Sequence, residues 1–249
     1  MKKIIFPLFL IVCLLLPVCL PVSGQGLTAQ AILDQVNEVL NAPKDQKMNI
    51  RLVLIDKDGK EETREFMMMQ KGKEMRMGKF LAPASQKGIG FLSLPNDVFY
   101  IYMPAYKKTQ RIAARQKSGK FAGTDFTYQD LGTQHYGDEW SSQLLGTEEN
   151  QYVLELTATP QNETGYARLR MWVDQSSFYP RRVEFYDQKQ NLAKILTSRK
   201  IERVAGYLVA RELEMEDVQK KHKTVMFIEE VAFDTGLSDE YFTERYLSR

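Results

Sequence analysis

The chain has 249 residues, with 34 lysines and arginines against 32 aspartates and glutamates, so its formal net charge is only +2. A nucleic-acid-binding protein usually carries a basic excess or a basic stripe, and this sequence has neither, so no nucleic-acid partner is expected. With two histidines and two cysteines, the chain also offers little material for a catalytic or metal-binding constellation, and we expect no metal and no cofactor.

The N-terminus has the pattern of an export signal. Lys2 and Lys3 form a short basic region, residues 4–20 are nearly all apolar, and small residues lead up to Gly24. We therefore predict a signal peptide over residues 1–24, cleaved near Gly24, and a mature protein in the periplasm. A retained signal anchor is the alternative, but the apolar run is shorter than the roughly 20 residues that span a bilayer, and prolines interrupt it.

Both cysteines, Cys13 and Cys19, lie inside this segment. Lipidation of Cys19 is a further alternative, although Val18 stands where a lipidation signal has a small residue such as Gly or Ala. Cleavage after Gly24 would leave a mature chain without cysteine, and therefore without disulfides or cysteine-based metal sites.

A helix is expected at the start of the mature chain. Thr28 is a suitable N-cap, and Asn41-Ala42-Pro43 would end the helix. Between them the apolar residues recur at helical spacing and form one stripe. These residues are Ile32, Leu33, Val36, Val39 and Leu40.

After Pro43 the apolar period changes from that of a helix to that of a strand. Tight turns at 57–60 and at Lys71-Gly72 join the first three strands into an antiparallel meander. We expect about ten strands, drawn from the ranges 48–57, 61–70, 75–78, 91–94, 98–103, 152–159, 167–174, 183–186, 192–199, 207–216 and 224–233.

The chain from residue 25 to residue 249 is expected to form a single, mainly β domain with flanking helices. No linker, repeat or low-complexity segment divides it, and a short second helix is expected to start at Ser238. A sheet of so many strands should curl or close. The N-terminal helix is the natural cover for its concave side, because the apolar stripe of that helix must be buried.

No sequence motif indicates an enzyme. The chain has no nucleophile elbow, phosphate-binding loop, dinucleotide fingerprint or paired-histidine motif. Asp125, Asp130 and His135 could be drawn as an acid–base set, but His135 in a glycine-flanked loop is better explained as a surface residue. His222 lies in a lysine-rich stretch that is typical of a solvated turn. We therefore predict a protein without catalytic residues.

Methionine is unusually concentrated on the predicted strands. Methionine is flexible and polarizable, so it adapts to irregular or changing apolar partners. Ordinary core filling explains any single one of them, whereas the group as a whole favours a curled sheet with more apolar lining than its own parts fill. The residues are Met67, Met68, Met69, Met75, Met77, Met103, Met171, Met215 and Met226.

Aromatic and basic residues occur together over 100–111, where three tyrosines are followed by Lys107, Lys108 and Arg111. This composition suits a lipid head-group or a membrane surface. A strand that ends in a solvated basic turn explains the same residues equally well.

Several segments in succession resemble the outer membrane lipoprotein-sorting protein family, which is similar in fold to the periplasmic lipoprotein carrier LolA. The resemblance covers most of the mature chain and implies an unclosed antiparallel β-barrel, with helices over a hydrophobic cavity that takes acyl chains. It rests on the segments Phe80–Pro83, Lys87–Leu92, Tyr100–Ala105, Arg111-Ile112, Phe121–Leu131 and Tyr179–Asp187.

The segment 121–131 would be a family hallmark, expected as a short helical or looped element near the mouth of the barrel. Gly123 would serve backbone geometry there, and Asp125 would cap a turn. The residues of this chain that carry the family motif are Lys87, Gly88, Arg111, Phe121, Gly123, Asp125, Phe126 and Asp130.

The main hypothesis is a periplasmic carrier or chaperone that binds an acyl chain of a lipid or lipoprotein and sorts it towards the outer membrane. Its partners would include an inner-membrane transporter of the resistance-nodulation-division (RND) type or an outer-membrane acceptor. The alternatives are an envelope sensor or adaptor that binds a protein partner with the same fold, and a lipid hydrolase. The expected cavity lining is Met67, Met69, Leu92, Ile101, Met103, Leu169 and Met171.

Overall fold

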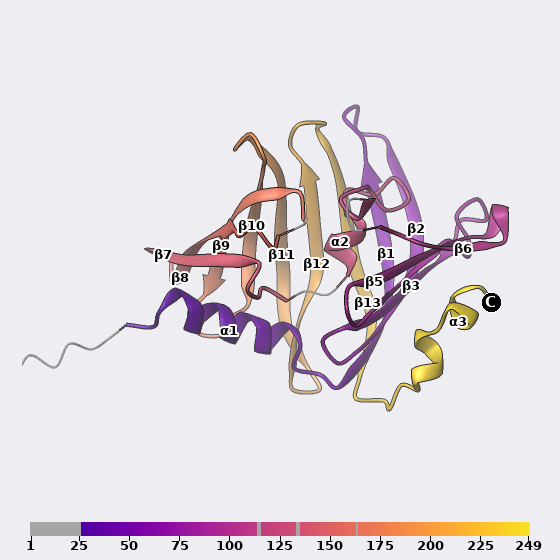
Figure 1. The fold of residues 1–249 in the computed structure, drawn as a ribbon, viewed down its shortest axis with the longest axis horizontal. Helices are drawn as coiled ribbons and strands as arrows, with labels where there is room; N and C mark the ends of the chain where they lie inside the picture. The colour runs from indigo at the N-terminus through magenta and orange to yellow at the C-terminus, as the bar shows by residue number, and fades with distance from the viewer. Residues whose placement is uncertain (1–25, 114–115, 133–134, 163) are drawn as a thin grey trace, which may run out of the picture.

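The computed structural model describes residues 26–249 except 114–115, 133–134 and 163, so the expected signal peptide and both cysteines lie outside the described residues. The described chain builds one antiparallel sheet of 13 strands with a few short helices (Figure 1). The strands are β1 Asp45–Ile55, β2 Glu61–Lys71, β3 Met75–Ala82, β4 Gly90–Leu94, β5 Val98–Met103, β6 Lys108–Arg111, β7 Trp140–Glu148, β8 Gln151–Ala158, β9 Tyr166–Asp174, β10 Pro180–Asp187, β11 Leu192–Val204, β12 Tyr207–Asp217 and β13 His222–Phe233. The helices are α1 Ala29–Leu40, η1 Pro104–Tyr106, α2 Tyr128–Leu131, η3 Asp239–Phe242 and α3 Glu244–Leu247.

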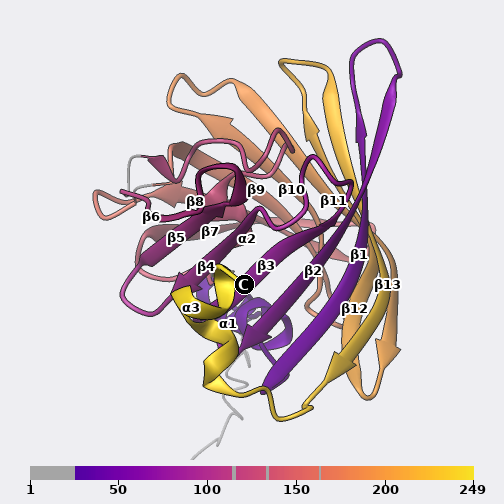
Figure 2. The ribbon, with the colours of Figure 1, turned by 90° about the vertical axis from the view of Figure 1, so that its right-hand side faces the viewer.

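The sheet consists of two meanders that meet in the middle. Strands β1 to β6 follow one another to one edge, β13 to β7 follow one another to the other edge, and β1 pairs with β13 at the junction. The two edge strands, β6 and β7, do not pair with each other, so the curved sheet stays open (Figure 2). This is the unclosed antiparallel β-barrel expected from the sequence.

The two strands that the sequence did not predict are the two edge strands. Strand β6 has the sequence Lys-Thr-Gln-Arg and no apolar residue at all, and β7 is polar at most of its positions. An edge strand pairs on one side only, so its ladder forms without the alternating apolar pattern that marks an inner strand.

Helix α1 lies where its apolar stripe predicted. The Thr28 hydroxyl accepts a hydrogen bond of 3.1 Å from the Ala31 amide, and Ile32, Leu33 and Val36 are fully buried. Figure 1 shows the helix across the lower end of the half of the sheet that holds β7 to β10. It therefore closes one end of the hollow side.

The concave side of β1 to β4 is filled by the protein's own side chains. Ile50 faces Phe66 across β1 and β2, Phe66 faces Phe80 across β2 and β3, and all three are buried in the main core. A Cβ at Gly78 would stand 2.4 Å from the ring of Phe66 and 2.6 Å from that of Phe91. Glycine at this position lets the rings close over the backbone.

The convex side of β2 to β4 is covered as well. Figure 2 shows η3 and α3 against this part of the sheet, where they contact β3 and β4. Sheet side chains from the convex face and apolar side chains from the C-terminal segment form a second, smaller core there. Its buried members are Met69, Met77, Leu92, Leu237, Phe242 and Leu247.

A buried carboxylate directs the C-terminal segment to that side. Asp45 accepts hydrogen bonds from the amide and hydroxyl of Thr235 and from the amides of Gly236 and Leu237, at 2.8–3.1 Å. Burial alone would raise the pKa of Asp45, but these hydrogen bonds lower it below its usual value. Asp45 therefore fixes the turn that follows β13 in its charged form.

We expect Leu247→Ala to lower the free energy of unfolding by about 2–4 kcal/mol, because Leu247 is 0% exposed and its removal leaves a cavity in the second core. Urea unfolding followed by circular dichroism measures the change. The matched control is Leu145→Ala on β7, where the side chain is 44% exposed and a change within about 0.5 kcal/mol is expected. Equal effects of the two substitutions would contradict a packed C-terminal cover.

Candidate ligand cavity beneath the crossing segment

The connection between the two edge strands passes over the hollow of the sheet. Strand β6 ends at Arg111 on one edge, and β7 begins at Trp140 on the other edge. We call the intervening residues 112–139 the crossing segment. Figure 1 shows its short helix α2 in front of the concave side. The crossing segment is therefore the element that covers the interior.

Phe121 anchors the crossing segment in one half of the hollow. Its ring stacks on Phe80 at 5.3 Å between centroids and meets Phe66 and Phe91 edge-on at 5.9 and 5.5 Å. Aromatic pairs in these geometries add stabilisation beyond their buried area. The part of the hollow over β1 to β3 is filled in this way, and the next residues of the segment lie towards β11 to β13.

A buried carboxylate, Asp125, fastens the segment to the sheet. One of its oxygens accepts a 2.6 Å hydrogen bond from Lys120. The other accepts one of 2.8 Å from the Thr224 hydroxyl and lies 2.5 Å from Nδ1 of His222. Lys120 also reaches Asp217 on β12 at 3.0 Å. A fully buried carboxylate is stable only when it is paired and hydrogen-bonded in this manner.

A second buried pair holds α2. Thr127 and Asp130 form a capping box, in which each side chain accepts a hydrogen bond from the other residue's amide. The same Asp130 carboxylate lies 3.3 Å from Lys194 on β11, and Lys194 donates a 2.8 Å bond to the carbonyl of Asp125. The capping residue of α2 is thus also its attachment to the sheet.

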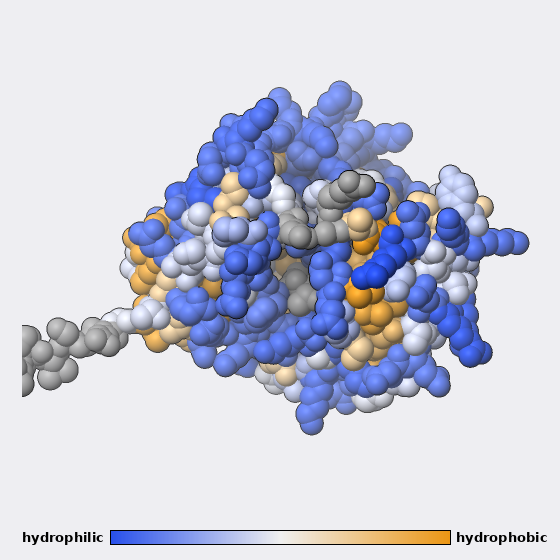
Figure 3. Space-filling view, viewed as in Figure 1, coloured by the Kyte–Doolittle hydropathy of each residue, from blue (hydrophilic) through white to orange (hydrophobic). Residues whose placement is uncertain are grey.

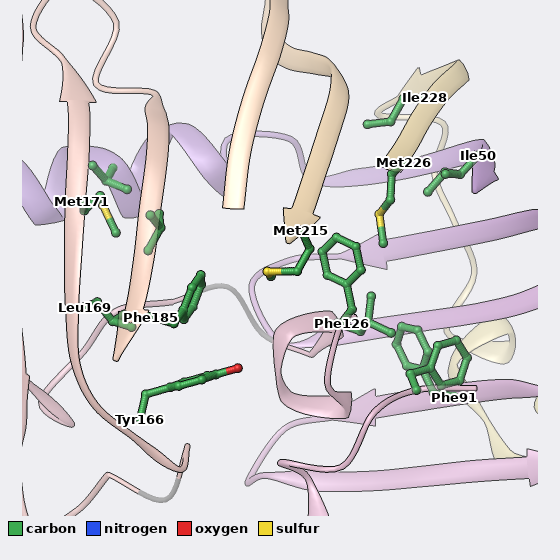
Figure 4. Packing of buried hydrophobic residues seen from close by; sticks show 14 of the residues in the cluster. Ile50, Phe91, Phe126, Tyr166, Leu169, Met171, Phe185, Met215, Met226 and Ile228 are labelled. Atoms are coloured by element: carbon green, nitrogen blue, oxygen red, sulfur yellow. The ribbon is translucent and has the colours of Figure 1, made fainter. Parts of the chain in front are cut away.

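Between the crossing segment and the sheet lies a cavity of about 540 Å³. Its wall has a large apolar part drawn from β4, β5, the crossing segment, β7 and β9 to β12. Figure 4 shows Leu169, Phe185, Met215 and Phe126 in this region. The apolar residues that line the cavity are Leu94, Phe99, Phe126, Trp140, Leu169, Phe185, Leu196 and Met215.

Strand register brings the sheet part of this wall together. Phe185 on β10 is the cross-strand partner of Leu169 on β9, and Leu196 on β11 is the partner of Met215 on β12. Cross-strand partners share one face of a sheet at about 5 Å between Cβ atoms. Alternation along four neighbouring strands therefore makes one continuous apolar surface.

The wall also contains a tyrosine. Figure 4 shows Tyr166 reaching from β9 with its hydroxyl directed towards Phe126 and Met215. The hydroxyl lies near Thr127, yet it is buried and forms no hydrogen bond of normal geometry within the described residues. Burial raises the pKa of Tyr166 well above its usual value, so this is a neutral hydroxyl.

The residues expected to line the cavity are divided by the structure between the two faces of the sheet. Leu169 lines the cavity, Met171 is fully buried in the main core, and Ile101 packs against that core. Met103 is exposed near the end of the hairpin between β5 and β6. The remaining three, Met67, Met69 and Leu92, point to the convex side and pack in the second core.

The physical reason for this division is that β2 to β4 are apolar on both faces. Period-two alternation cannot assign such a strand to one face, and a shift of one residue exchanges the two. In β2, for example, Phe66 points to the concave side and Met67 to the convex side. The proposed lining on these strands therefore does not coincide with the cavity.

Most motif residues of the crossing segment act in it directly. Phe121, Asp125 and Asp130 anchor it, Phe126 lines the cavity, and Gly123 adopts a φ of +80° that favours glycine.

The other motif residues lie outside the cavity. Gly88, at φ +86°, donates a hydrogen bond to the Phe80 carbonyl beside Lys87, in the turn before β4. A Cβ on Gly88 would stand 2.9 Å from Pro104, so this turn packs on the η1 hairpin. Arg111 is an exposed residue at the end of β6.

The histidines do not form the acid–base set that Asp125, Asp130 and His135 suggested. His135 is exposed at the cavity rim, whereas the histidine beside Asp125 is His222, which lies on β13 and not in a solvated turn. Asp125 and Asp130 are both engaged in holding the crossing segment. Within the described residues, no group of three or more His, Cys, Asp or Glu side chains could hold a metal ion.

Several cavity residues were not predicted from the sequence. Trp140 begins an edge strand, and Phe185, Leu196 and Met215 lie on strands that were expected but were not assigned a face. Tyr166 immediately precedes the predicted range of its strand. The signal that could have found some of them is alternation: Leu169 lies between Arg168 and Arg170, and Phe185 lies between Glu184 and Tyr186. None of the helices in the described part of the chain has both the length and the apolar composition needed to span a bilayer.

The chain was compared with known families and proteins. The family model that matches carries the description "-like: Uncharacterized protein" and covers residues 72–249, more than two thirds of the chain. No curated protein matches.

Solved structures match over nearly the whole chain. A domain from Vibrio parahaemolyticus, described as an outer membrane lipoprotein-sorting protein domain, is 27% identical with a TM-score of 0.80, covering 89% of this chain and 100% of its own. A DUF1329 family protein from Desulfovibrio piger is 26% identical with a TM-score of 0.82, covering 88% and 99%. A LolA superfamily protein from Nitrosomonas europaea, 24% identical with a TM-score of 0.74 and covering 89% and 100%, shares the fold.

The attachment of the crossing segment should depend on pH. Burial alone would raise the pKa of Asp217, but its hydrogen bond from Lys120 lowers it, and the pKa of Lys120 is raised by its two carboxylates against the effect of burial. A carboxylate with a lowered folded-state pKa stabilises the fold above its ordinary pKa of about 3.9 and loses this contribution as the pH falls through the folded value.

We expect Lys120→Met to lower the free energy of unfolding by about 2 kcal/mol at neutral pH, since it removes the cation that two buried carboxylates share. The loss should shrink as the pH falls below the ordinary aspartate pKa of about 3.9 and through the lowered pKa of Asp217, where the contribution of that carboxylate is lost. Urea unfolding at several pH values measures both effects. Lys57→Met removes an exposed ion pair with Asp58 and serves as the control with no comparable loss. A loss that is constant with pH would contradict the ion-pair explanation.

Proposed function

Because this chain belongs to the LolA-like outer membrane lipoprotein-sorting protein family, we propose that it is a periplasmic carrier that holds an acyl chain of a lipid or lipoprotein in the cavity beneath the crossing segment. The cavity is the observation that carries the proposal. Part of the concave side is filled by the protein's own rings, whereas the rest keeps a cavity of about 540 Å³ whose wall includes eight apolar side chains.

Burial of hydrocarbon supplies the affinity for such a cargo. Each methylene group moved from water into an apolar site contributes about 0.8 kcal/mol. The cavity offers Phe126, Leu169 and Met215 as contacts, and methionine adapts to chains of different shape. Transfer of a bound acyl chain makes and breaks no covalent bond, so this role needs no catalytic residue.

The similarity to an outer membrane lipoprotein-sorting domain supports a place in the cell envelope and transport towards the outer membrane. The N-terminal pattern that ends at Gly24 supports export. We include in the proposal a donor or acceptor in one of the two membranes, such as a transporter of the RND type. The rival proposal is an envelope sensor or adaptor that uses the same fold to bind a protein.

The direct test is native mass spectrometry of the mature protein purified from periplasm without detergent, followed by solvent extraction. The carrier proposal expects a stoichiometric added mass that resolves into an acyl lipid or lipopeptide. A protein that is empty and that also takes up no lipid offered in excess would support the sensor or adaptor.

A pair of substitutions on one strand tests the location. We expect Leu196→Glu to lower the affinity for a fatty acid at least 10-fold, because a carboxylate in the apolar wall must be desolvated when a chain binds. Ile195→Glu is the matched control, since its side chain is also partly buried but lies on the opposite face of β11. We expect the control to keep the affinity of the unsubstituted protein.

Tryptophan fluorescence provides the measurement. The chain has two tryptophans, of which Trp140 lines the cavity. In a Trp172→Phe background the emission of Trp140 should shift when a fatty acid binds. Equal affinities of the Leu196→Glu and Ile195→Glu variants would place the binding site elsewhere.

A further inference from the structure

Two arginines are buried on the concave side of neighbouring strands, and they differ in their ion pairing. Arg64 on β2 is 6% exposed and Arg76 on β3 is 3% exposed. Each donates a 2.6 Å hydrogen bond to a backbone carbonyl of the crossing segment, Arg64 to Ala122 and Arg76 to Gly132. The two side chains therefore make the same kind of contact with the same segment.

Of these two arginines, only Arg64 pairs with a carboxylate among the described residues. Its Nε and Nη2 reach the two oxygens of Glu62 at 2.8 and 3.2 Å, and its guanidinium lies over the ring of Phe80. This is the bidentate arrangement that suits a buried guanidinium. The charge of Arg64 is neutralised within the protein.

Arg76 has no such partner among the described residues. Its Nε is buried without a hydrogen bond, and within the described residues its guanidinium donates only to the neutral carbonyl of Gly132. Burial lowers the pKa of Arg76 to about 10, so it still carries its charge at neutral pH. An isolated buried charge is strongly unfavourable unless an opposite charge or several hydrogen bonds compensate it.

The guanidinium lies directly behind one wall of the cavity. Three neighbours of Arg76 line the cavity. Ser93 is its cross-strand partner on β4, Gly132 accepts its hydrogen bond, and the Tyr136 hydroxyl interacts with it electrostatically. Arg76 itself lies behind these three neighbours and is not one of the lining residues. The cavity that we propose for an acyl chain therefore ends beside an uncompensated cation.

The acidic residues at this end of the cavity do not supply the missing charge. Asp97 pairs with Lys117, Asp130 pairs with Lys194, and Glu74 is exposed at the rim and forms no ion pair with Arg76.

We propose that Arg76 binds the anionic group of the cargo, so that the ligand of the cavity is an anionic amphiphile with a carboxylate or a phosphate at the end of its acyl chain. This inference rests on the proposed carrier function and names its substrate class. The chain would lie along the apolar wall, and its anionic group would accept hydrogen bonds from Arg76. A guanidinium suits both anions because it presents paired donors in one plane.

Two further buried polar atoms in the wall fit an amphiphile better than a pure hydrocarbon. The side-chain oxygen of Gln129 and the hydroxyl of Tyr166 both line the cavity without a hydrogen bond in the described structure. Gln129 can accept from a ligand hydroxyl, and Tyr166 can donate to an ester carbonyl. A polar portion of the cargo next to its anionic group would satisfy them.

The experiment compares three probes that share one alkyl chain, laurate, dodecyl phosphate and dodecanol, by isothermal titration calorimetry at neutral pH. The mature protein should bind at least one of the two anions about 10-fold or more tightly than the alcohol, as expected for a charge-assisted hydrogen bond. Laurate against dodecyl phosphate distinguishes a carboxylate cargo from a phosphate cargo.

Arg76→Met should abolish this preference and leave the affinity for dodecanol unchanged. Arg76→Lys, which keeps the charge, should retain part of the preference and guards against a misfolded methionine variant. Arg64→Met is the matched control. It removes an arginine that is equally buried and makes the same kind of backbone contact but is already paired, so the preference should remain.

Thermal unfolding of the empty protein gives a second readout. Arg76→Met should raise Tm or leave it unchanged, because it removes an uncompensated charge. Arg64→Met should lower Tm, because it removes a paired guanidinium together with its hydrogen bond to Ala122.

The outcomes separate the two proposals. A mature protein that binds none of the three probes overturns both the carrier function and the role of Arg76. A protein that binds all three equally, or an Arg76→Met variant that keeps the preference for anions, overturns only the role of Arg76.

Discussion

The architecture depends on one topological constraint, which is that the two edge strands of an open sheet are joined by a single connection. Strands β6 and β7 follow each other in the chain but lie at opposite edges. The crossing segment must therefore span the hollow, and it cannot do so as a solvated loop, because it lies over an apolar surface. Its contacts with that surface decide which part of the interior is solid and which part is hollow.

The two halves of the interior differ because the crossing segment carries different residues over each. Phe121 completes a packed group of rings over β2 to β4, where Gly78 lets the backbone and the rings come close. Over β9 to β12 the segment has no comparable group, and the space of about 540 Å³ remains. Protein interiors are normally packed to the density of organic crystals, so a space of this size, with apolar side chains over part of its wall, has the character of a ligand site.

Much of this architecture could be predicted from the sequence. Alternation predicted the inner strands, and the cap at Thr28 predicted the start of α1. The family resemblance of the ordered segments between Phe80 and Asp187 predicted the barrel. The edge strands β6 and β7 were not predicted, because a strand that is paired on one side needs no apolar face. The cavity lining was not predicted for a different reason. Strands β2 and β3 are apolar on both faces, so alternation could not identify the concave face.

The anchoring of the crossing segment could not be predicted at all, since it joins residues that are far apart in the chain. Lys194 and Asp130 are 64 positions apart, and Asp125 and Thr224 are 99 apart. No local pattern distinguishes these lysines and aspartates from the many exposed ones. Only the register of β11 to β13 against the crossing segment brings them together, and burial then makes their pairing obligatory.

These anchors have a physical consequence for the uptake of a cargo. The inner strands are held by backbone ladders on both sides, whereas residues 124–132 are fastened mainly through a few side chains. Opening the sheet would break many hydrogen bonds at once, while lifting α2 breaks the bonds of Lys194 and Arg76 and exposes Phe126. Local opening follows the path with the fewest buried contacts and backbone bonds. The crossing segment is therefore the least strongly held part of the cavity wall. Arg76, which donates to the carbonyl of Gly132, lies where release of this segment and an anionic cargo would compete for the same guanidinium.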